Sequence, residues 1–380
     1  MRNKYVTIIL LLTIVVFAYS QVDAQNLLSG EYLLHINYLE DTEELESISI
    51  LNLSFDKSNW TTAYHLDLDY KVNLKDSSND ITLNEAYFDY YGEDFDLRIG
   101  QQVVNWGTAI EYNPTSNLNP LEEIGLMGDK SPIMMINGQY YIDRQYNVQG
   151  AIIPYHKPTM EEIYIKNLDQ TIQASPIEDD LNNAELALKW TGRGINGFDF
   201  SLSYFRGFED LPTAEIGFNQ TPEGPAPYIE DVYYREVSIY GADIATSYKG
   251  VGLWTEGAYM VPEDGVEYSS AVIGADYKLE NGVYLEGQAI YIKDKLENEN
   301  IIIQTAIENT FKQIHEFRLG TVYNIETKGY LIKPEVEFSL SDATKLSLSY
   351  EYFEGKLLNN EMMNKTLGEN GLKIELSYSF

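Results

Sequence analysis

The last ten residues of the chain, Gly371 to Phe380, read GLKIELSYSF, and they decide the fold. Polar residues alternate there with one unbroken apolar face, formed by Leu372, Ile374, Leu376, Tyr378 and Phe380. Period-two alternation predicts a β-strand that is apolar on one face and polar on the other. An exposed apolar edge strand invites aggregation, and a barrel removes that hazard by closing its last strand onto its first.

The composition supports a barrel that crosses a membrane. The chain has 380 residues, of which 44% are hydrophobic and 31 are Tyr, yet no long apolar run occurs beyond the N-terminus. Transmembrane barrels distribute apolar surface in this way, since each strand carries only about ten residues through the lipid. The net charge of −33 disfavours nucleic-acid binding. It fits either a cation-attracting lumen or a saline habitat.

Residues 1–24 have the pattern of a secretory signal peptide. Arg2 and Lys4 precede an apolar stretch, and Val22-Asp23-Ala24 predicts cleavage before Gln25. A membrane anchor helix is the alternative, but the apolar stretch is short for a span. We therefore expect an exported protein with a single barrel domain over residues 25–380.

Further alternating segments predict about eighteen strands in a closed, antiparallel, all-β barrel. Segments 133–143 and 300–310 have the weakest patterns, so sixteen strands is the alternative. The eighteen predicted strands are 30–39, 45–56, 59–74, 81–92, 94–104, 133–143, 145–156, 183–192, 196–207, 231–248, 251–261, 267–279, 282–293, 300–310, 313–325, 328–340, 342–354 and 370–380.

When the connections are numbered in chain order, their lengths depend on whether the number is odd or even. The long ones, at 105–132, 157–182, 208–230 and 355–369, all fall on odd positions, and every even connection is short. Up-and-down barrels have short periplasmic turns at one end and long extracellular loops at the other. The parity predicts an even strand number with both termini on the periplasmic side.

Two stretches resemble known outer-membrane barrels. Tyr378 and Phe380 match the terminal aromatic pair that serves as the assembly signal of such barrels. Residues 97–120 resemble the R-x-G-[K/R]-Q-x-x-x-W-G segment, followed by an Asn-Pro-rich loop, of porin-like barrels from Gram-negative-type bacteria. Arg98, Gly100, Gln102, Trp106 and Gly107 match this pattern, whereas Gln101 stands where a basic residue is frequent. The resemblance implies a porin-like protein that the barrel-assembly machinery inserts, with no particular substrate.

The matched strand predicts a polar lumenal surface. Asp96, Arg98, Gly100 and Gln102 alternate with apolar residues and should face the lumen. Glu85, Tyr87 and Asp89 on the neighbouring strand should face the same way. Arg98 among these carboxylates predicts a lumenal ion pair, which either belongs to a selectivity ladder or only braces the wall.

The connection 105–132 is the best candidate for a constriction. Barrels of sixteen to eighteen strands leave an aqueous channel unless something fills it. This long connection carries Glu111, Glu122 and Glu123, and it follows Trp106, which is either an interfacial anchor or the hinge of an infolding loop. The alternative is an extracellular loop with no effect on the pore.

An enzyme is not expected. The histidines His35, His65, His156 and His315 lie on separate segments, and no nucleophile elbow, His-Glu-x-x-His pair or phosphate-binding loop is present. His65 beside Asp67 gives the one weak indication of a hydrolase. We predict no metal site and no cofactor.

The sequence therefore predicts a porin-like channel for passive diffusion of small hydrophilic solutes or ions, with a preference for cations. The alternative is a plugged barrel that acts as a surface binding or adhesion protein. Expected partners are outer-membrane lipid, the barrel-assembly machinery and the solutes, with a homotrimer as one assembly that a wide barrel allows.

Overall fold

The computed structural model describes residues 28–40, 42–123, 125, 128–165, 170–221, 224–312, 314–358 and 370–380. The predicted signal peptide lies outside the described residues. Eighteen strands form one sheet, and two further pairs, β8 with β9 and β12 with β13, form separate hairpins. The elements are β1 (Leu28–Leu39), β2 (Glu44–Ser58), β3 (Thr62–Asn73), β4 (Asn79–Tyr91), β5 (Phe95–Gln102), β6 (Ile133–Tyr141), β7 (Tyr146–Ile153), β8 (Glu162–Ile165), β9 (Gln170–Gln173), a 3₁₀ turn (Leu181–Asn183), β10 (Glu185–Ile195), β11 (Phe198–Phe208), β12 (Thr213–Thr221), β13 (Gly224–Tyr233), β14 (Glu236–Tyr248), β15 (Val251–Pro262), β16 (Tyr268–Lys278), β17 (Tyr284–Lys293), β18 (Glu299–Phe311), β19 (His315–Asn324), β20 (Tyr330–Ser339), β21 (Thr344–Glu354) and β22 (Gly371–Ser379).

The sheet closes on itself through its first and last strands. β22 pairs with β1 in an antiparallel register that runs from Glu31 opposite Ser379 to Leu39 opposite Gly371. Gly30 and Phe380 add two backbone hydrogen bonds of 2.9 Å. The predicted closing strand is confirmed, and so is the count of eighteen strands, which makes the alternative of sixteen wrong.

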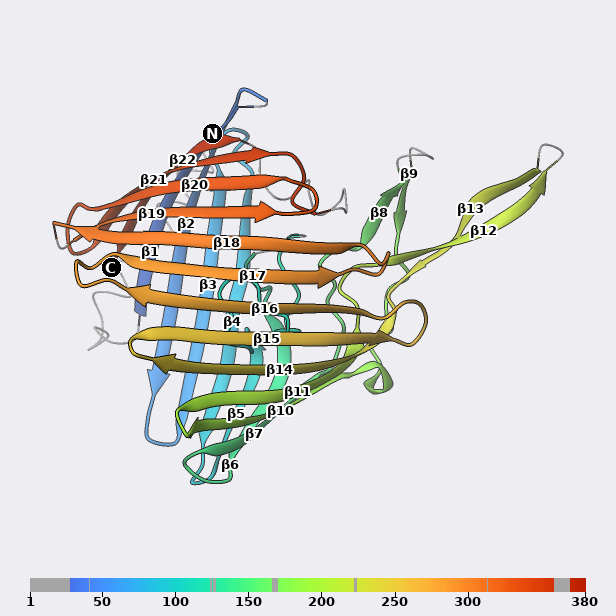
Figure 1. Ribbon diagram of the computed structural model, residues 1–380, viewed down its shortest axis with the longest axis horizontal. Helices are drawn as coiled ribbons and strands as arrows, with labels where there is room; N and C mark the ends of the chain where they lie inside the picture. The colour runs from blue at the N-terminus through green and yellow to red at the C-terminus, as the bar shows by residue number, and fades with distance from the viewer. Residues whose placement is uncertain are drawn as a thin grey trace, which may run out of the picture.

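The two ends of the barrel differ as the connection lengths predict. Short turns join the strands at one end, and the long connections 105–132, 157–182 and 208–230 lie at the other (Figure 1). Most of the fourth, 355–369, lies outside the described residues. The hairpins β8–β9 and β12–β13 project from the long-loop end. They also explain one wrong boundary: predicted strand 231–248 begins only at Glu236 as β14, because Asp231 to Tyr233 belong to β13.

The outer surface of the barrel is apolar. Leu202, Tyr240 and Ile273 are each more than half exposed, at 54%, 53% and 64%. Lipid solvates such a wall, whereas water would drive it to associate. No helix in the described part of the chain is long and apolar enough to cross a membrane.

Candidate permeation pathway

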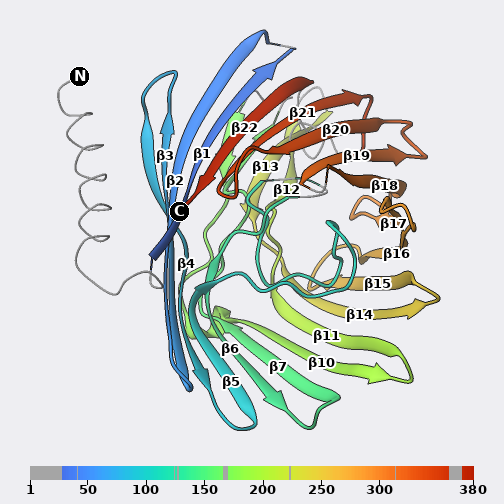
Figure 2. The ribbon, with the colours of Figure 1, turned by 90° about the vertical axis from the view of Figure 1, so that its left-hand side faces the viewer.

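The connection between β5 and β6, residues 103–132, folds into the barrel and is called the infolded segment below. In Figure 2 it crosses the space inside the ring of strands. The Asn119 side chain holds the two ends of the segment together. It accepts a hydrogen bond from the Val104 backbone N–H (2.8 Å) and donates to the carbonyls of Gln102 and Ser131 (both 2.9 Å). The prediction that this connection turns inward is confirmed.

Across the lumen, one buried carboxylate receives the segment. Glu256 on β15 is 2% exposed. Its Oε2 accepts from the backbone N–H groups of Thr108 (2.8 Å) and Ala109 (3.0 Å). Its Oε1 accepts from both the backbone N–H and the hydroxyl of Thr115, each at 2.8 Å. Gly107 has a φ of +95°, and a Cβ there would lie 2.4 Å from both carboxylate oxygens, so only glycine fits.

The segment then follows the wall along β17, β18 and β19. Gln288 on β17 donates to the carbonyl of Ile110 (2.6 Å). The carboxylate of Glu111 accepts from Gln304 on β18 and from Arg318 on β19, the latter at 2.9 Å. Glu111 has a positive φ of 63°, in the left-handed region. These contacts place the Glu111 carboxylate against the wall opposite the root of the segment.

Apolar packing adds to these polar contacts. Trp106 is 3% exposed, and its indole N–H donates to Gln149 Oε1 at 3.0 Å. Inward-facing residues such as Met135, Ile153 and Val237 pack with it in one buried cluster. In a second cluster Leu357 and Leu358, from the connection after β21, join Ile290, Ile302 and the partly buried Ala109, Ile110 and Tyr112.

Hollows in the described part of the barrel lie along the strands that follow the segment's contact with Arg318. The first, about 610 Å³, lies between the segment (Glu111, Gly128, Asp129) and strands β18–β22. The second, about 460 Å³, extends toward the short-turn end, since the turn residue Gly282 helps to line it. Both are lined by Arg318 and Glu335, so they adjoin. Together they form a candidate passage along β19 and β20.

Charged, half-exposed side chains line this passage. Lys333 and Lys373 approach the same oxygen of Glu351, at 3.2 and 2.8 Å. Arg318 pairs with Glu111 at 2.9 Å and with Glu308 at 3.3 Å. Among the described residues, neither Glu316 nor Glu335 has a lysine or arginine within ion-pair distance. Carboxylates therefore outnumber basic groups in the lining.

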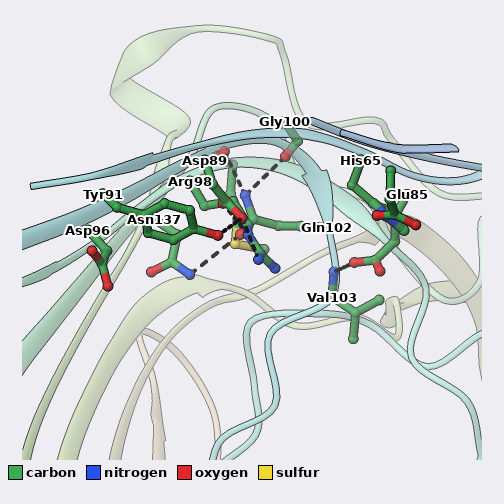
Figure 3. Close-up of polar contacts among 12 residues, drawn as sticks. His65, Glu85, Asp89, Tyr91, Asp96, Arg98, Gly100, Gln102, Val103 and Asn137 are labelled. Atoms are coloured by element: carbon green, nitrogen blue, oxygen red, sulfur yellow. Dashed lines mark hydrogen bonds and ion pairs between the residues drawn. The ribbon is translucent and has the colours of Figure 1, made fainter. Parts of the chain in front are cut away.

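The predicted ion pair of Arg98 is present between β4 and β5 (Figure 3). Its guanidinium donates to both oxygens of Asp89, at 2.7 and 2.9 Å. It also lies 3.7 Å above the ring of Tyr87, against which His65 stacks. Gly100 has no room for a side chain, because a Cβ would lie 2.2 Å from the Ala86 carbonyl of the neighbouring strand. This bidentate ion pair, whose carboxylate is 5% exposed, has the geometry of the bracing alternative.

The other candidate lining residues are distributed around the infolded segment. Glu85 accepts from the backbone N–H of Val103 at 2.7 Å, and Asp96 accepts from the Tyr141 hydroxyl at 2.6 Å. Gln102 is fully buried and donates to the carbonyls of Gly100 and Met135. Glu122 and Glu123 are exposed. Their roles, and those of Asp89, Arg98, Trp106 and Glu111, in lining or constricting a pore stay predictions.

Sequence reasoning missed the residues that receive the segment. These are Glu256, Gln288, Gln304 and Arg318. One signal was available: Glu256 shares the inward face of its strand with the apolar residues Trp254 and Ala258. A carboxylate within an apolar inward face must find hydrogen-bond donors. The weak hydrolase indication paired His65 with Asp67, whereas His65 Nδ1 lies 2.7 Å from Asp56.

A second polar cluster lies at the long-loop end. His156 Nδ1 lies 3.0 Å from Glu185, between the rings of Phe208 and Tyr234. Burial, together with the negative charge of Glu185, raises the pKa of the nearby Asp210 carboxyl to about 6. The charges of Lys130, His156 and Lys295 oppose this rise. The cluster joins the bases of both projecting hairpins to the end of the infolded segment.

The sequence matches no known family model and no curated protein. Solved structures are similar in fold. OccK5 (OpdH) of Pseudomonas aeruginosa has 9% sequence identity and a TM-score of 0.57, with 93% of this chain and 96% of that chain covered. OccAB4 of Acinetobacter baumannii has 9% identity and a TM-score of 0.56, over 93% and 97% of the two chains.

This chain shares their fold. A third similar structure, OccK2 (OpdF) of Pseudomonas aeruginosa, was solved in complex with glucuronate. It has 10% identity and a TM-score of 0.53, and 93% of this chain and 96% of that chain are covered. At these identities the likeness concerns the closed barrel alone.

Proposed function

We propose that the protein is a bacterial outer-membrane channel for passive diffusion of small hydrophilic solutes, narrowed by the infolded segment. The observation that carries this proposal is the pair of adjoining hollows that share Arg318 and Glu335. A polar, charged lining replaces part of the hydration shell of a passing solute. The short-turn end is periplasmic in this proposal, and residues 1–24 direct export.

We further propose that the channel prefers cations. Glu308, Glu316, Glu335 and Glu337 line the hollow nearer the short turns, with only Lys278 and Arg318 as basic groups. Opposite charges raise the local concentration of a mobile ion in such a low-dielectric passage. The whole chain has the same sign, with a net charge of −33.

The solute class is small and hydrophilic in this proposal. The hollows have volumes of about 610 and 460 Å³. This range suits a ligand of modest size. OccK2, which has a similar fold, was solved with glucuronate, a small hydrophilic molecule.

Tyr378 and Phe380 are proposed to direct insertion by the assembly machinery.

Purified protein in planar bilayers tests the channel proposal. We expect steady single-channel conductance and, in a potassium chloride gradient, a reversal potential with the sign of cation preference. Neutral solutes in a liposome swelling assay should enter at rates that fall steeply with size. A barrel that inserts but conducts no ions over a wide voltage range would exclude the channel and favour the plugged barrel.

A further inference from the structure

The docking of the infolded segment depends on a carboxylate with an unusual set of partners. Among the described residues Glu256 has four donors, all of them uncharged: three backbone N–H groups and one hydroxyl. They come from two stretches of the segment, Thr108-Ala109 and Thr115, which Glu256 holds together. The side chain is 2% exposed, so water does not compete for these bonds.

Only an ionised glutamate satisfies this arrangement. Each carboxylate oxygen accepts two of the four hydrogen bonds. A glutamine has one acceptor oxygen. Even in its better orientation, its NH₂ group would face the Thr115 hydroxyl, which can accept, and the Thr115 backbone N–H, which then lacks a partner. Hydrogen bonds to a buried charge are stronger than neutral ones, and a buried donor left without a partner is costly. The geometry therefore concentrates much of the docking energy in one side chain.

We propose that Glu256 is the positioning residue of the constriction, and that its carboxylate keeps the infolded segment against the far wall. Without it, the segment leaves the wall and the passage widens and fluctuates. Gly107 is part of the same contact, because its missing side chain lets the Glu256 carboxylate reach the segment. This inference rests on the proposed channel function for its effect on permeation. Its effect on the position of the segment does not depend on transport.

Thiol labelling at Thr108 tests the position of the segment. The chain has no cysteine, so Thr108→Cys introduces the only thiol. The Thr108 hydroxyl is buried. We therefore expect slow alkylation by a membrane-impermeant maleimide in otherwise wild-type protein. Glu256→Ala should accelerate alkylation about tenfold or more, because the segment then opens more often.

Single-channel recording gives the second readout. Glu256→Ala should raise the mean conductance and add fluctuation between levels, and Glu256→Gln should have an intermediate effect. Asp276→Asn is the matched control. It removes a carboxylate from neighbouring β16 that bonds Gly252 and Tyr284 but not the segment. Asp276→Asn should leave alkylation at wild-type rates.

The outcomes separate this inference from the channel proposal. Folded Glu256→Ala protein that alkylates and conducts like wild type would overturn the role of Glu256 and leave the channel intact. Accelerated alkylation in a protein that never conducts would support the role of Glu256 and exclude the channel. If Glu256→Ala fails to fold, the same comparison is made with Glu256→Gln. Unchanged alkylation in that variant overturns the inference.

Discussion

The lumen has two walls of opposite character. The docking wall, formed by the inward faces of β6, β7, β10, β11 and β14–β18, carries apolar residues such as Ile290 and Ile302, both 0% exposed. The bare wall, formed by β19–β22 and β1–β4, carries charges, and the segment meets it at its two margins, where Arg318 of β19 bonds Glu111 and Glu85 of β4 bonds Val103. The side chains of Lys333 and Lys373 there are 40% and 43% exposed. Apolar inward residues mark the surface that the infolded segment covers, and charged ones mark the surface that faces water.

Of the changes that test the contrast between the two walls, removal of the infolded segment should have the largest effect. Gln102 pairs directly with Ile133, so a short Gly-Ser turn can replace residues 104–131. We expect a severalfold rise in single-channel conductance, because the lumen loses the segment that fills it.

The control for this replacement removes chain outside the lumen. Thr213 pairs with Tyr233 at the base of the hairpin β12–β13, so residues 214–232 can be replaced in the same way. This hairpin projects beyond the barrel (Figure 1), and its loss should leave the conductance unchanged. Equal conductance of wild type and the folded 104–131 replacement would mean that the segment does not narrow the passage.

Charge neutralisation on the bare wall should have the next largest effect. The double change Glu316→Gln and Glu335→Gln removes two carboxylates that have no basic partner among the described residues. The reversal potential in a salt gradient should move toward zero, since cation preference falls. Glu263→Gln, in the connection after β15, should not move it. An unchanged potential in the double variant would assign the selectivity elsewhere.

The Arg98–Asp89 pair, between β4 and β5, offers a test of stability at the margin of the bare wall. Arg98→Met leaves Asp89, which is 5% exposed, without its guanidinium partner. We expect a loss of about 2 kcal/mol in the free energy of unfolding, measured by urea titration in lipid vesicles. Arg206→Met is the control. The Arg206 side chain is 59% exposed beside Glu236, so its loss should lower the free energy of unfolding clearly less than the loss of Arg98. Equal effects of the two variants would contradict a bracing role.

At the long-loop end we expect a smaller effect, a dependence of stability on pH. The pKa of Asp210 is raised from 3.8 to about 6, so the folded state favours the protonated carboxyl. Wild-type protein should therefore lose stability as the pH rises from about 4 through about 6. Asp210→Asn removes this dependence, and its melting temperature should exceed that of wild type at pH 7.5 but not near pH 4. Parallel pH profiles of the two proteins would contradict the raised pKa.

The sequence predicted the barrel well because the outer face of every strand meets the same solvent. Lipid demands apolar residues at every second position, and this requirement is local and visible in each strand. Segments 133–143 and 300–310 had the weakest patterns for a physical reason. Ile133, Met135 and Ile302 face inward under the infolded segment, so both faces of these strands are apolar there. The loss of alternation was itself the mark of the docking wall.

The candidate site could be predicted only in part. The Arg98–Asp89 pair follows from alternation on two neighbouring strands, and the inward turn of 105–132 follows from its length. The partners across the lumen do not, because Thr108 and Glu256 are far apart in sequence and meet only once the barrel closes. The side on which the segment docks is likewise set by the closed barrel.

The infolded segment lies against the docking wall, and a cross-link between the two tests this contact. A Cβ placed on Gly241 of β14 would lie 3.2 Å from the Cβ of Thr115, and a shift of a few tenths of an ångström brings the pair to the spacing of a disulfide. Thr115→Cys and Gly241→Cys are introduced together with Ser203→Ala, which removes a hydroxyl that the new side chain would meet. Mild oxidation should close this disulfide in the folded barrel and protect both thiols from alkylation. Two thiols that both remain free and react readily in the folded, oxidised protein would contradict it.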